Sequence, residues 1–171
     1  MQKRKSVFLL ILLLLLFLGL VCFLPLSKAV QIGGDEGFEL AKATLCQKGF
    51  KLYTDVWNDQ PPLHTFLITK ILDHLTPSVA GPRLLTVGFS VLLLTSFFFI
   101  CNKYFGVWIA VVGTGMLLAA PIFLEIGVSC MLEVPAMAPA LAMIWVLSRS
   151  NGAKLLTWRE VLAGALLAIS S

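Results

Sequence analysis

Two long stretches without a charged residue constrain this chain more than any other feature of its sequence. Residues 6–27 and residues 84–102 contain neither an acid nor a base. Each is close to the roughly 20 apolar residues that a helix needs to cross a bilayer. Because the hydrocarbon core offers no water to backbone N–H and C=O groups, we expect both stretches to be helical.

The composition indicates an integral membrane protein. Of the 171 residues, 58% are hydrophobic and 13% are charged, whereas soluble domains average about 25% charged residues. We predict a single all-α polytopic membrane domain over residues 1–171 with about five membrane-spanning helices. Their expected ranges are 7–27, 84–102, 104–121, 131–148 and 158–171. The last range is shorter than the ~17–25 residues of a full span, so we expect the chain to be the front part of a longer protein.

Basic residues indicate which ends of these helices face the cytoplasm. Seven of the 13 basic residues, but only one of the 9 acids, fall in short segments at residues 3–5, at residue 103 and at residues 149–160. Short loops rich in Lys and Arg stay in the cytoplasm, so the N-terminus is predicted to be cytoplasmic. The loop 28–83 is then predicted to lie on the outer side.

The first apolar stretch has a second interpretation. Its basic start and the segment Leu26–Ala29 are compatible with a cleaved signal peptide. The apolar run is longer than the ~7–15 residues of a signal core, which favours a retained span. Cleavage would leave the later loops on the same sides of the membrane.

The outer loop is expected to hold two amphipathic helices. Asp35 is a natural N-cap for the first, with its carboxylate accepting a backbone N–H of the first turn, and Gly49 suits the C′ position. Pro61-Pro62 opens the second helix, because proline is tolerated in a first turn. Both helices are too short to span and are expected to lie along the membrane surface. Their apolar faces consist of Phe38, Ala41 and Leu45, and of Leu63, Phe66, Leu67, Ile71 and Leu75.

The predicted topology gathers four acids on the outer side: Asp35, Glu36, Glu125 and Glu133. Asp35 is equally compatible with a helix cap alone and with a general base that positions a hydroxyl nucleophile. Glu36 suits a supporting role, and Glu125 is compatible with a solvated loop position. Glu133 stands at the start of a span, where a carboxylate is costly and therefore indicates function.

Asp55, Asp59, His64 and Arg83 are further candidates, for substrate binding. A histidine on an amphipathic helix is more often a surface or interface residue than a ligand. Arg83 stands at the outer mouth of a span, where it would either pair with a phosphate group or anchor the helix at the interface.

Other kinds of site are not supported. No basic patch interleaved with aromatic residues indicates nucleic-acid binding. With 2 histidines and no Cys/His cluster, a zinc site is not expected, and no cofactor is predicted. Cys46 and Cys130 both fall on the outer side in this topology. A disulfide between them is compatible with the sequence, although spacing alone cannot specify the pairing.

An ordered set of residues in the outer loop matches a known pattern. Its members are Asp35-Glu36, Lys48-Gly49, Leu52-Tyr53, Asp55, Trp57, Pro61-Pro62-Leu63 and Arg83. Over most of residues 5–148 the chain resembles the front end of GT-C glycosyltransferases of family 39. These include protein O-mannosyltransferases and the lipid A aminoarabinose transferase. The resemblance implies a GT-C-like fold, a polyprenyl-phosphate-linked sugar as donor, and a hydroxyl of a lipid, glycan or protein as acceptor.

The resemblance also implies roles for individual residues. Asp35 would act on the acceptor hydroxyl with Glu36 beside it, and Arg83 would face the donor phosphate. Glu133-Val134-Pro135 stands where the family commonly has Asp before a proline, so the Glu is a departure. Asp35, Glu36 and Glu133 are therefore the candidate catalytic residues. The implied reaction is direct displacement at the anomeric carbon without a metal, at the outer face of a bacterial inner membrane.

A non-enzymatic membrane protein is the alternative prediction, either an assembly subunit or part of a transporter. A transporter is expected to show broken helices or polar residues at mid-span. The predicted spans are almost free of charge, and the acids gather at one face. This distribution favours chemistry on a lipid substrate.

Overall fold

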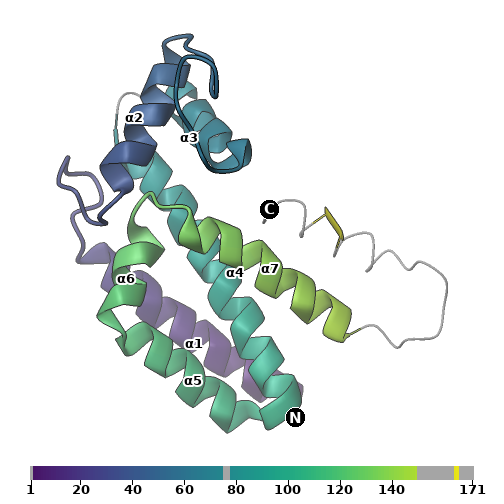
Figure 1. The fold of residues 1–171 in the computed structure, drawn as a ribbon. Helices are drawn as coiled ribbons and strands as arrows, with labels where there is room; N and C mark the ends of the chain where they lie inside the picture. The colour runs from purple at the N-terminus through teal and green to yellow at the C-terminus, as the bar shows by residue number, and fades with distance from the viewer. Residues whose placement is uncertain (1, 75–77, 150–163, 166–171) are drawn as a thin grey trace.

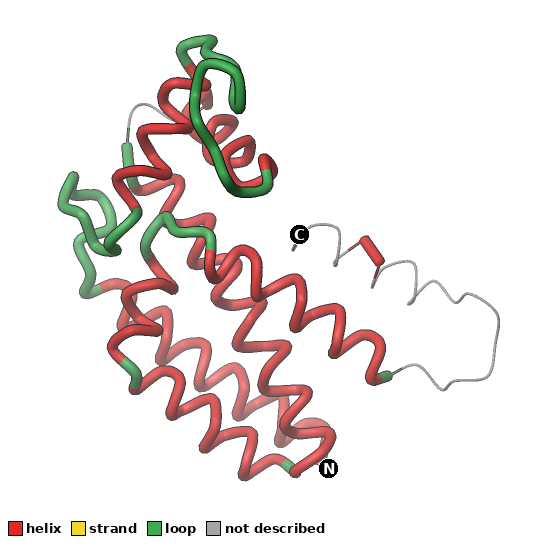
Figure 2. Tube along the Cα trace, in the orientation of Figure 1, coloured by secondary structure: helices red, strands yellow, loops and turns green. Residues whose placement is uncertain are grey.

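The computed structural model describes residues 2–74, 78–149 and 164–165. The regular elements of these residues are helices, which confirms the all-α class (Figure 1). Figure 2 shows that the longest loops lie at the end of the molecule that carries α2 and α3. The helices are α1 (Gln2–Cys22), α2 (Glu36–Gln47), α3 (Pro62–His74), α4 (Ala80–Phe105), α5 (Val107–Ala119), α6 (Pro121–Val128) and α7 (Glu133–Ser148).

Two of the described helices are long and apolar enough to cross a membrane, α1 over Arg4–Cys22 and α4 over Ala80–Phe105. Helices α5 and α6 pass the same test only as one bent pair, and α7 is shorter, with 16 residues. Two to three spans therefore qualify in the described residues, instead of the five predicted. The fifth predicted span, 158–171, lies outside the described residues except for 164–165.

The third predicted span, 104–121, is interrupted. Helix α5 stops at Ala119, and α6 continues from Pro121 at an angle of 75°. Ala120 between them is extended, with ψ of 116°, which is the conformation that a residue before proline prefers. The sequence analysis leaves a loop between the predicted spans 104–121 and 131–148, but most of that segment is helical, since α6 covers Pro121–Val128.

Helices α1, α4, α5 and α7 form a bundle in which α4 contacts each of the other three (Figure 1). The largest core includes Phe17, Leu94, Val128 and Val134, which are at most 1% exposed. The N-terminus and the α4–α5 turn lie at one end of the bundle, and α2, α3 and the α6–α7 link lie toward the other. This arrangement follows the predicted alternation of loops, while the cytoplasmic location of the N-terminus stays a prediction.

Both long helices differ from their predicted limits. Helix α1 ends at Cys22 rather than near residue 27, because Pro25 disfavours helical backbone at the residue before it. Helix α4 begins at Ala80 rather than at residue 84. Arg83 therefore belongs to the first turn of α4, where its side chain reaches the segment that leaves α1.

Helices α2 and α3 begin at the positions that their local signals predict, and α2 also ends where predicted. Helices α2 and α3 start directly after Asp35 and at Pro62. At the end of α2, Gly49 has φ of 95°, and its N–H donates to Cys46 O while the Phe50 N–H donates to Leu45 O. This Schellman motif satisfies carbonyl groups that the helix end would otherwise leave unpaired.

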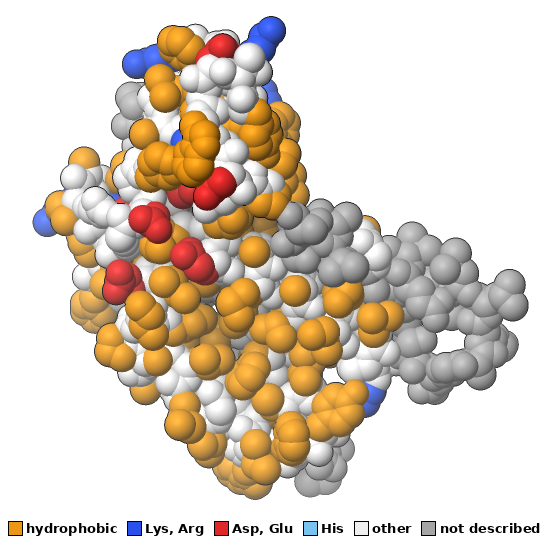
Figure 3. All heavy atoms as spheres, viewed as in Figure 1, with side chains coloured by type: hydrophobic (Ala, Val, Ile, Leu, Met, Phe, Trp, Pro, Cys, Tyr) orange, Lys and Arg blue, Asp and Glu red, His pale blue; other side chains and the backbone are white. Residues whose placement is uncertain are grey.

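Helices α2 and α3 pack on each other partly through polar side chains. Apolar side chains on their outer faces stay open: Phe38 is 48% exposed, Leu45 is 39% exposed and Phe66 is 55% exposed. Figure 3 shows hydrophobic side chains on the surface of this part of the molecule. Exposed apolar faces suit the predicted location at a membrane surface. The buried members of the two helices are Glu36, Glu39, Lys42, Ala43, His64, Thr65 and Ile68.

Candidate functional site

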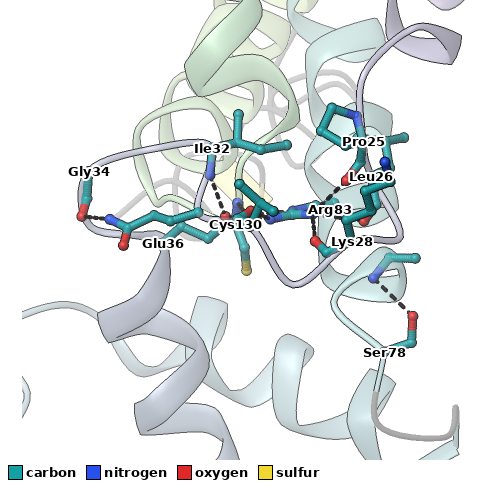
Figure 4. A network of polar contacts seen from close by, with 12 residues as sticks. Pro25, Leu26, Lys28, Ile32, Gly34, Glu36, Ser78, Arg83 and Cys130 are labelled. Atoms are coloured by element: carbon teal, nitrogen blue, oxygen red, sulfur yellow. Dashed lines mark hydrogen bonds and ion pairs between the residues drawn. The ribbon is translucent and has the colours of Figure 1, made fainter.

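A buried ion pair between Glu36 and Arg83 joins α2 to α4 (Figure 4). Arg83 Nε lies 2.7 Å from Glu36 Oε1, and Arg83 Nη2 lies 2.7 Å from Glu36 Oε2. Both side chains are 1% exposed. Two parallel N–H···O bonds make this a strong and directional form of pairing.

The rest of the Arg83 guanidinium binds the chain that leaves α1. A guanidinium has five N–H donors, and the contacts in the structure engage all three of its nitrogens. No nitrogen of Arg83 is therefore left unbonded for the contact with a donor phosphate that the resemblance implies. Besides Glu36, the acceptors are the carbonyl oxygens of Pro25, Leu26, Lys28 and Val30.

Glu36 also accepts two backbone N–H groups. The Ile32 N–H donates to Oε2 at 3.0 Å, and the Cys130 N–H donates to Oε1 at 3.0 Å. Burial by itself raises the pKa of the Glu36 carboxyl, but the hydrogen bonds from Arg83, Ile32 and Cys130 outweigh burial and lower it. Glu36 is thus an ionised anchor that ties the start of α2 to the α6–α7 link.

The chain before α2 lies directly against the α6–α7 link at Gly33. A Cβ atom added to Gly33 would overlap the Met131 sulfur and would lie 2.7 Å from Ser129 Oγ. Glycine is the residue that allows so close an approach. Together with the bond from Cys130 to Glu36, this crossing holds residues 33–36 against residues 129–131.

Two of the predicted catalytic acids flank this crossing. Asp35 lies two residues after Gly33, Glu133 lies two residues after Met131, and both acids are exposed. Glu125, on α6, is also exposed. Figure 3 shows acidic side chains gathered near α6 and the beginnings of α2 and α7. Three of the four acids that the topology assigned to one side are therefore exposed near this crossing, while Glu36 is buried.

Asp35 occupies the N-cap position of α2, but the predicted cap hydrogen bond does not form. Its backbone has φ of −102° and ψ of 3°, outside the β-region values from which an N-cap side chain usually reaches back to the helix. Capping therefore does not account for this carboxylate, which stays accessible from outside the protein.

A second polar group is buried between α2, α3 and the loop that joins them. Lys42 Nζ lies 2.8 Å from Glu39 Oε1 and 2.9 Å from Asn58 Oδ1, and His64 Nδ1 lies 3.5 Å from Glu39 Oε2. Burial raises the pKa of the Glu39 carboxyl, but His64 and Lys42 outweigh it and lower the pKa. Only His64 is a candidate from the sequence, since a Glu and a Lys three residues apart are typical of a solvated helix face.

The remaining predicted binding residues, Asp55, Asp59 and His64, lie outside the two segments of the crossing in the sequence. Asp55 Oδ2 accepts the N–H of Lys51 at 2.9 Å within the loop between α2 and α3. Tyr53, with φ of 70°, donates its hydroxyl to a carbonyl of the same loop. The Tyr-x-Asp segment thus shapes the loop itself. Asp59 is exposed in this loop and His64 is 5% exposed, and a role in substrate binding stays a prediction for all three predicted residues.

The two cysteines on the predicted outer side are not joined to each other. Cys46 and Cys130 are both free, so the disulfide that the sequence allowed is not formed. Cys130 is buried beside Ala43 and Ile68, and burial raises the pKa of its thiol. Among the described residues, no group of three or more His, Cys, Asp or Glu side chains is arranged to hold a metal ion.

Comparison with known proteins found no matching family, no matching curated protein and no matching solved structure. The resemblance to family 39 glycosyltransferases therefore stays a prediction. Chemically, an accessible carboxylate on a firmly held chain segment is able to accept a proton from a hydroxyl group.

Proposed function

We propose that this chain carries the acceptor-activating part of a membrane glycosyltransferase. The donor is a sugar linked to a polyprenyl phosphate, and the acceptor is a hydroxyl of a lipid, a glycan or a protein. The reaction takes place at the end of the bundle that holds α2, α3 and the α6–α7 link. In this proposal that end faces the non-cytoplasmic side of a bacterial inner membrane.

The observation that carries the proposal is an open carboxylate on an anchored segment. Asp35 is exposed and forms no cap hydrogen bond. The next residue, Glu36, is held by Arg83 and by two backbone N–H groups. Because orientation supplies much of the gain in an enzyme reaction, a free carboxylate next to such an anchor suits a general base.

Asp35 accepts the proton of the acceptor hydroxyl while the hydroxyl oxygen attacks the anomeric carbon. The bond between that carbon and the phosphate oxygen breaks, and the polyprenyl phosphate leaves with the electron pair. A new glycosidic bond forms on the opposite face, so the configuration inverts. Phosphate is a good leaving group, and a base with correct orientation is sufficient for this step.

Glu133 has a second role at the same site. It is the first residue of α7 and is exposed beside the crossing. A carboxylate there is placed to accept hydrogen bonds from sugar or acceptor hydroxyls. Glu36 and Arg83 are positioning residues, since their polar atoms are engaged within the protein.

Replacing Asp35 with Asn tests the role of the base, because Asn has a similar size and cannot take up the proton. Cells that lack the gene are complemented with each variant of the natural protein, and their lipids, glycans and proteins are compared by mass spectrometry. Deletion is expected to remove a sugar-sized mass, which the unmodified gene restores. The Asp35→Asn variant is expected to slow its formation about 10²–10⁴-fold at an unchanged protein level.

Asp73→Asn is the matched control, since Asp73 is an exposed acid near the end of α3 that pairs with exposed Lys70. This control is expected to restore the sugar-sized mass fully. Equal restoration by both variants would remove Asp35 from the mechanism.

The break between α5 and α6 favours a second candidate, a non-enzymatic part of a transporter. Broken helices commonly line substrate paths in transporters, and this pair is bent by 75°. In that case deletion would change the uptake or export of a solute and would leave every glycan, lipid and protein mass as it was.

A further inference from the structure

A cavity opens at the end of the bundle opposite the candidate site. Its volume is about 620 Å³, and it lies between α1, the last turns of α4 and the end of α7. The site proposed for sugar transfer contributes no residue to it. The cavity is therefore separate from that site.

Three cations line this cavity, one from each helix region: Arg4, Lys103 and Arg149. Each of the three side chains is exposed. None of the described residues that line the cavity is acidic. An anion is thus the favoured occupant, and a phosphate ester suits a cluster of Arg and Lys donors.

The wall of the cavity is apolar and open to the outside of the bundle. Phe8 is 66% exposed and Ile11 is 49% exposed along α1. On the other side, the Phe99 and Trp145 rings stack at 5.1 Å with an angle of 8°. Because α1 qualifies as a membrane span, this wall faces acyl chains rather than water.

We propose that the cavity binds an anionic phospholipid of the leaflet at this end of the bundle. Its phosphate lies among Arg4, Lys103 and Arg149, and an acyl chain lies along Phe8 and Ile11. Basic pockets between membrane helices are suited to such headgroups. A free phosphate ion would use the cations but not the apolar wall, so a lipid fits both parts of the cavity.

Native mass spectrometry of the purified full-length protein tests this proposal. The protein is titrated with phosphatidylglycerol and, separately, with the zwitterionic phosphatidylcholine. Phosphatidylglycerol is expected to bind more tightly. Replacing one of the three basic side chains is expected to weaken phosphatidylglycerol binding about fivefold, and replacing all three is expected to weaken it roughly a hundredfold. The test variant combines Arg4→Gln, Lys103→Gln and Arg149→Gln.

The matched control removes the same charge at the other end of the molecule, with Lys28→Gln, Lys48→Gln and Lys51→Gln, all exposed residues. It is expected to bind phosphatidylglycerol like the unmodified protein. Equal affinities of the test and control variants, or equal affinities for the two lipids, would overturn the proposal.

A second variant keeps all three cations and fills the apolar part of the cavity, Ile11→Trp. It is expected to weaken phosphatidylglycerol binding, and it decides the question if the triple variant does not fold. Unchanged binding by Ile11→Trp would contradict the proposed acyl-chain position. Displacement of the lipid by inorganic phosphate at an equal concentration would show that the cavity recognises phosphate alone, which also overturns the proposal.

Discussion

Glu36 and Arg83, 47 positions apart in the chain, form a buried two-point ion pair with N–O distances of 2.7 Å. Each partner also binds backbone groups of other segments. Arg83 holds the carbonyls of the chain that leaves α1, and Glu36 holds the Cys130 N–H of the α6–α7 link. The pair therefore joins four segments at the end of the bundle where the open acids lie.

Loss of the Glu36 carboxylate is expected to destabilise the fold severely. The Glu36→Ala variant leaves the Arg83 charge buried without its partner, which costs about 3–5 kcal/mol in comparable cases. Thermal unfolding in detergent measures the effect. Glu125→Ala is the control, since Glu125 is exposed, and its midpoint is expected to stay near that of the unmodified protein. Similar midpoints for the two variants would show that the pair does not hold this end together.

Stability is expected to fall in acid because the folded state lowers the pKa of Glu36 and of Glu39. The ordinary carboxyl pKa is 4.5, so the unfolded chain takes up these protons before the folded chain does. Stabilisation by these groups is complete above that pH and is lost as the pH falls through the lower folded values. Unfolding midpoints between about pH 7 and about pH 3 measure the loss.

The comparison for this acid effect is Glu36→Gln, which cannot change its charge. Its midpoint is expected to vary less with pH than that of the unmodified protein, with Glu39 providing the remainder. A pH dependence as steep as that of the unmodified protein would mean that folding does not lower the pKa of Glu36.

The crossing at Gly33 is expected to reject any larger residue. Gly33→Ala places a Cβ against Met131 and Ser129, and overpacking of this kind costs about 1–3 kcal/mol. The neighbouring Gly34→Ala is a strict control, because nothing lies within 4 Å of its added Cβ. Chemical or thermal unfolding of both variants gives the difference. A Gly33→Ala protein as stable as Gly34→Ala would disprove the close approach.

The buried cluster around Lys42 offers a comparison with a surface ion pair. Lys42→Met leaves Glu39 buried without its cation and is expected to cost about 3–5 kcal/mol. Lys70→Met removes a pair in which the lysine side chain is 55% exposed, and such pairs contribute about 0–1 kcal/mol. Unfolding midpoints measured side by side separate the two. A smaller loss for Lys42→Met than for Lys70→Met would rule out the buried pairing.

The parts of the fold that the sequence predicted correctly follow from the backbone preferences of single glycine and proline residues. Gly49 ends α2 because it adopts a positive φ, and Pro62 opens α3 because a first turn needs no N–H there. Pro121 was expected to end a span, and it does interrupt the helix. Helix α6 was not predicted, although the proline that ends α5 also starts it. Such features depend on a few neighbouring residues, so they can be read from the chain.

No local sequence pattern predicts the polar contacts of the candidate site. Periodicity shows which face of α2 is apolar, but in a membrane protein lipid as well as protein can cover an apolar face. Glu39 and Lys42 have the spacing of a solvated ion pair and are buried, whereas Phe38, on the predicted apolar face, is 48% exposed. Arg83 looked free for a phosphate, because its acceptors lie 47 to 58 positions away in the chain.

The sequence by itself determined that this is a helical membrane protein with an acid-bearing segment after its first span. Uncharged stretches of that length have no other stable form in a bilayer. Only the tertiary structure decided which acids are buried and which are exposed. Glu36 is buried and bonded to Arg83, whereas the neighbouring Asp35 is exposed. That division arises from contacts among α2, α4 and the α6–α7 link. No spacing along the chain encodes it, because those partners meet only when the bundle has formed.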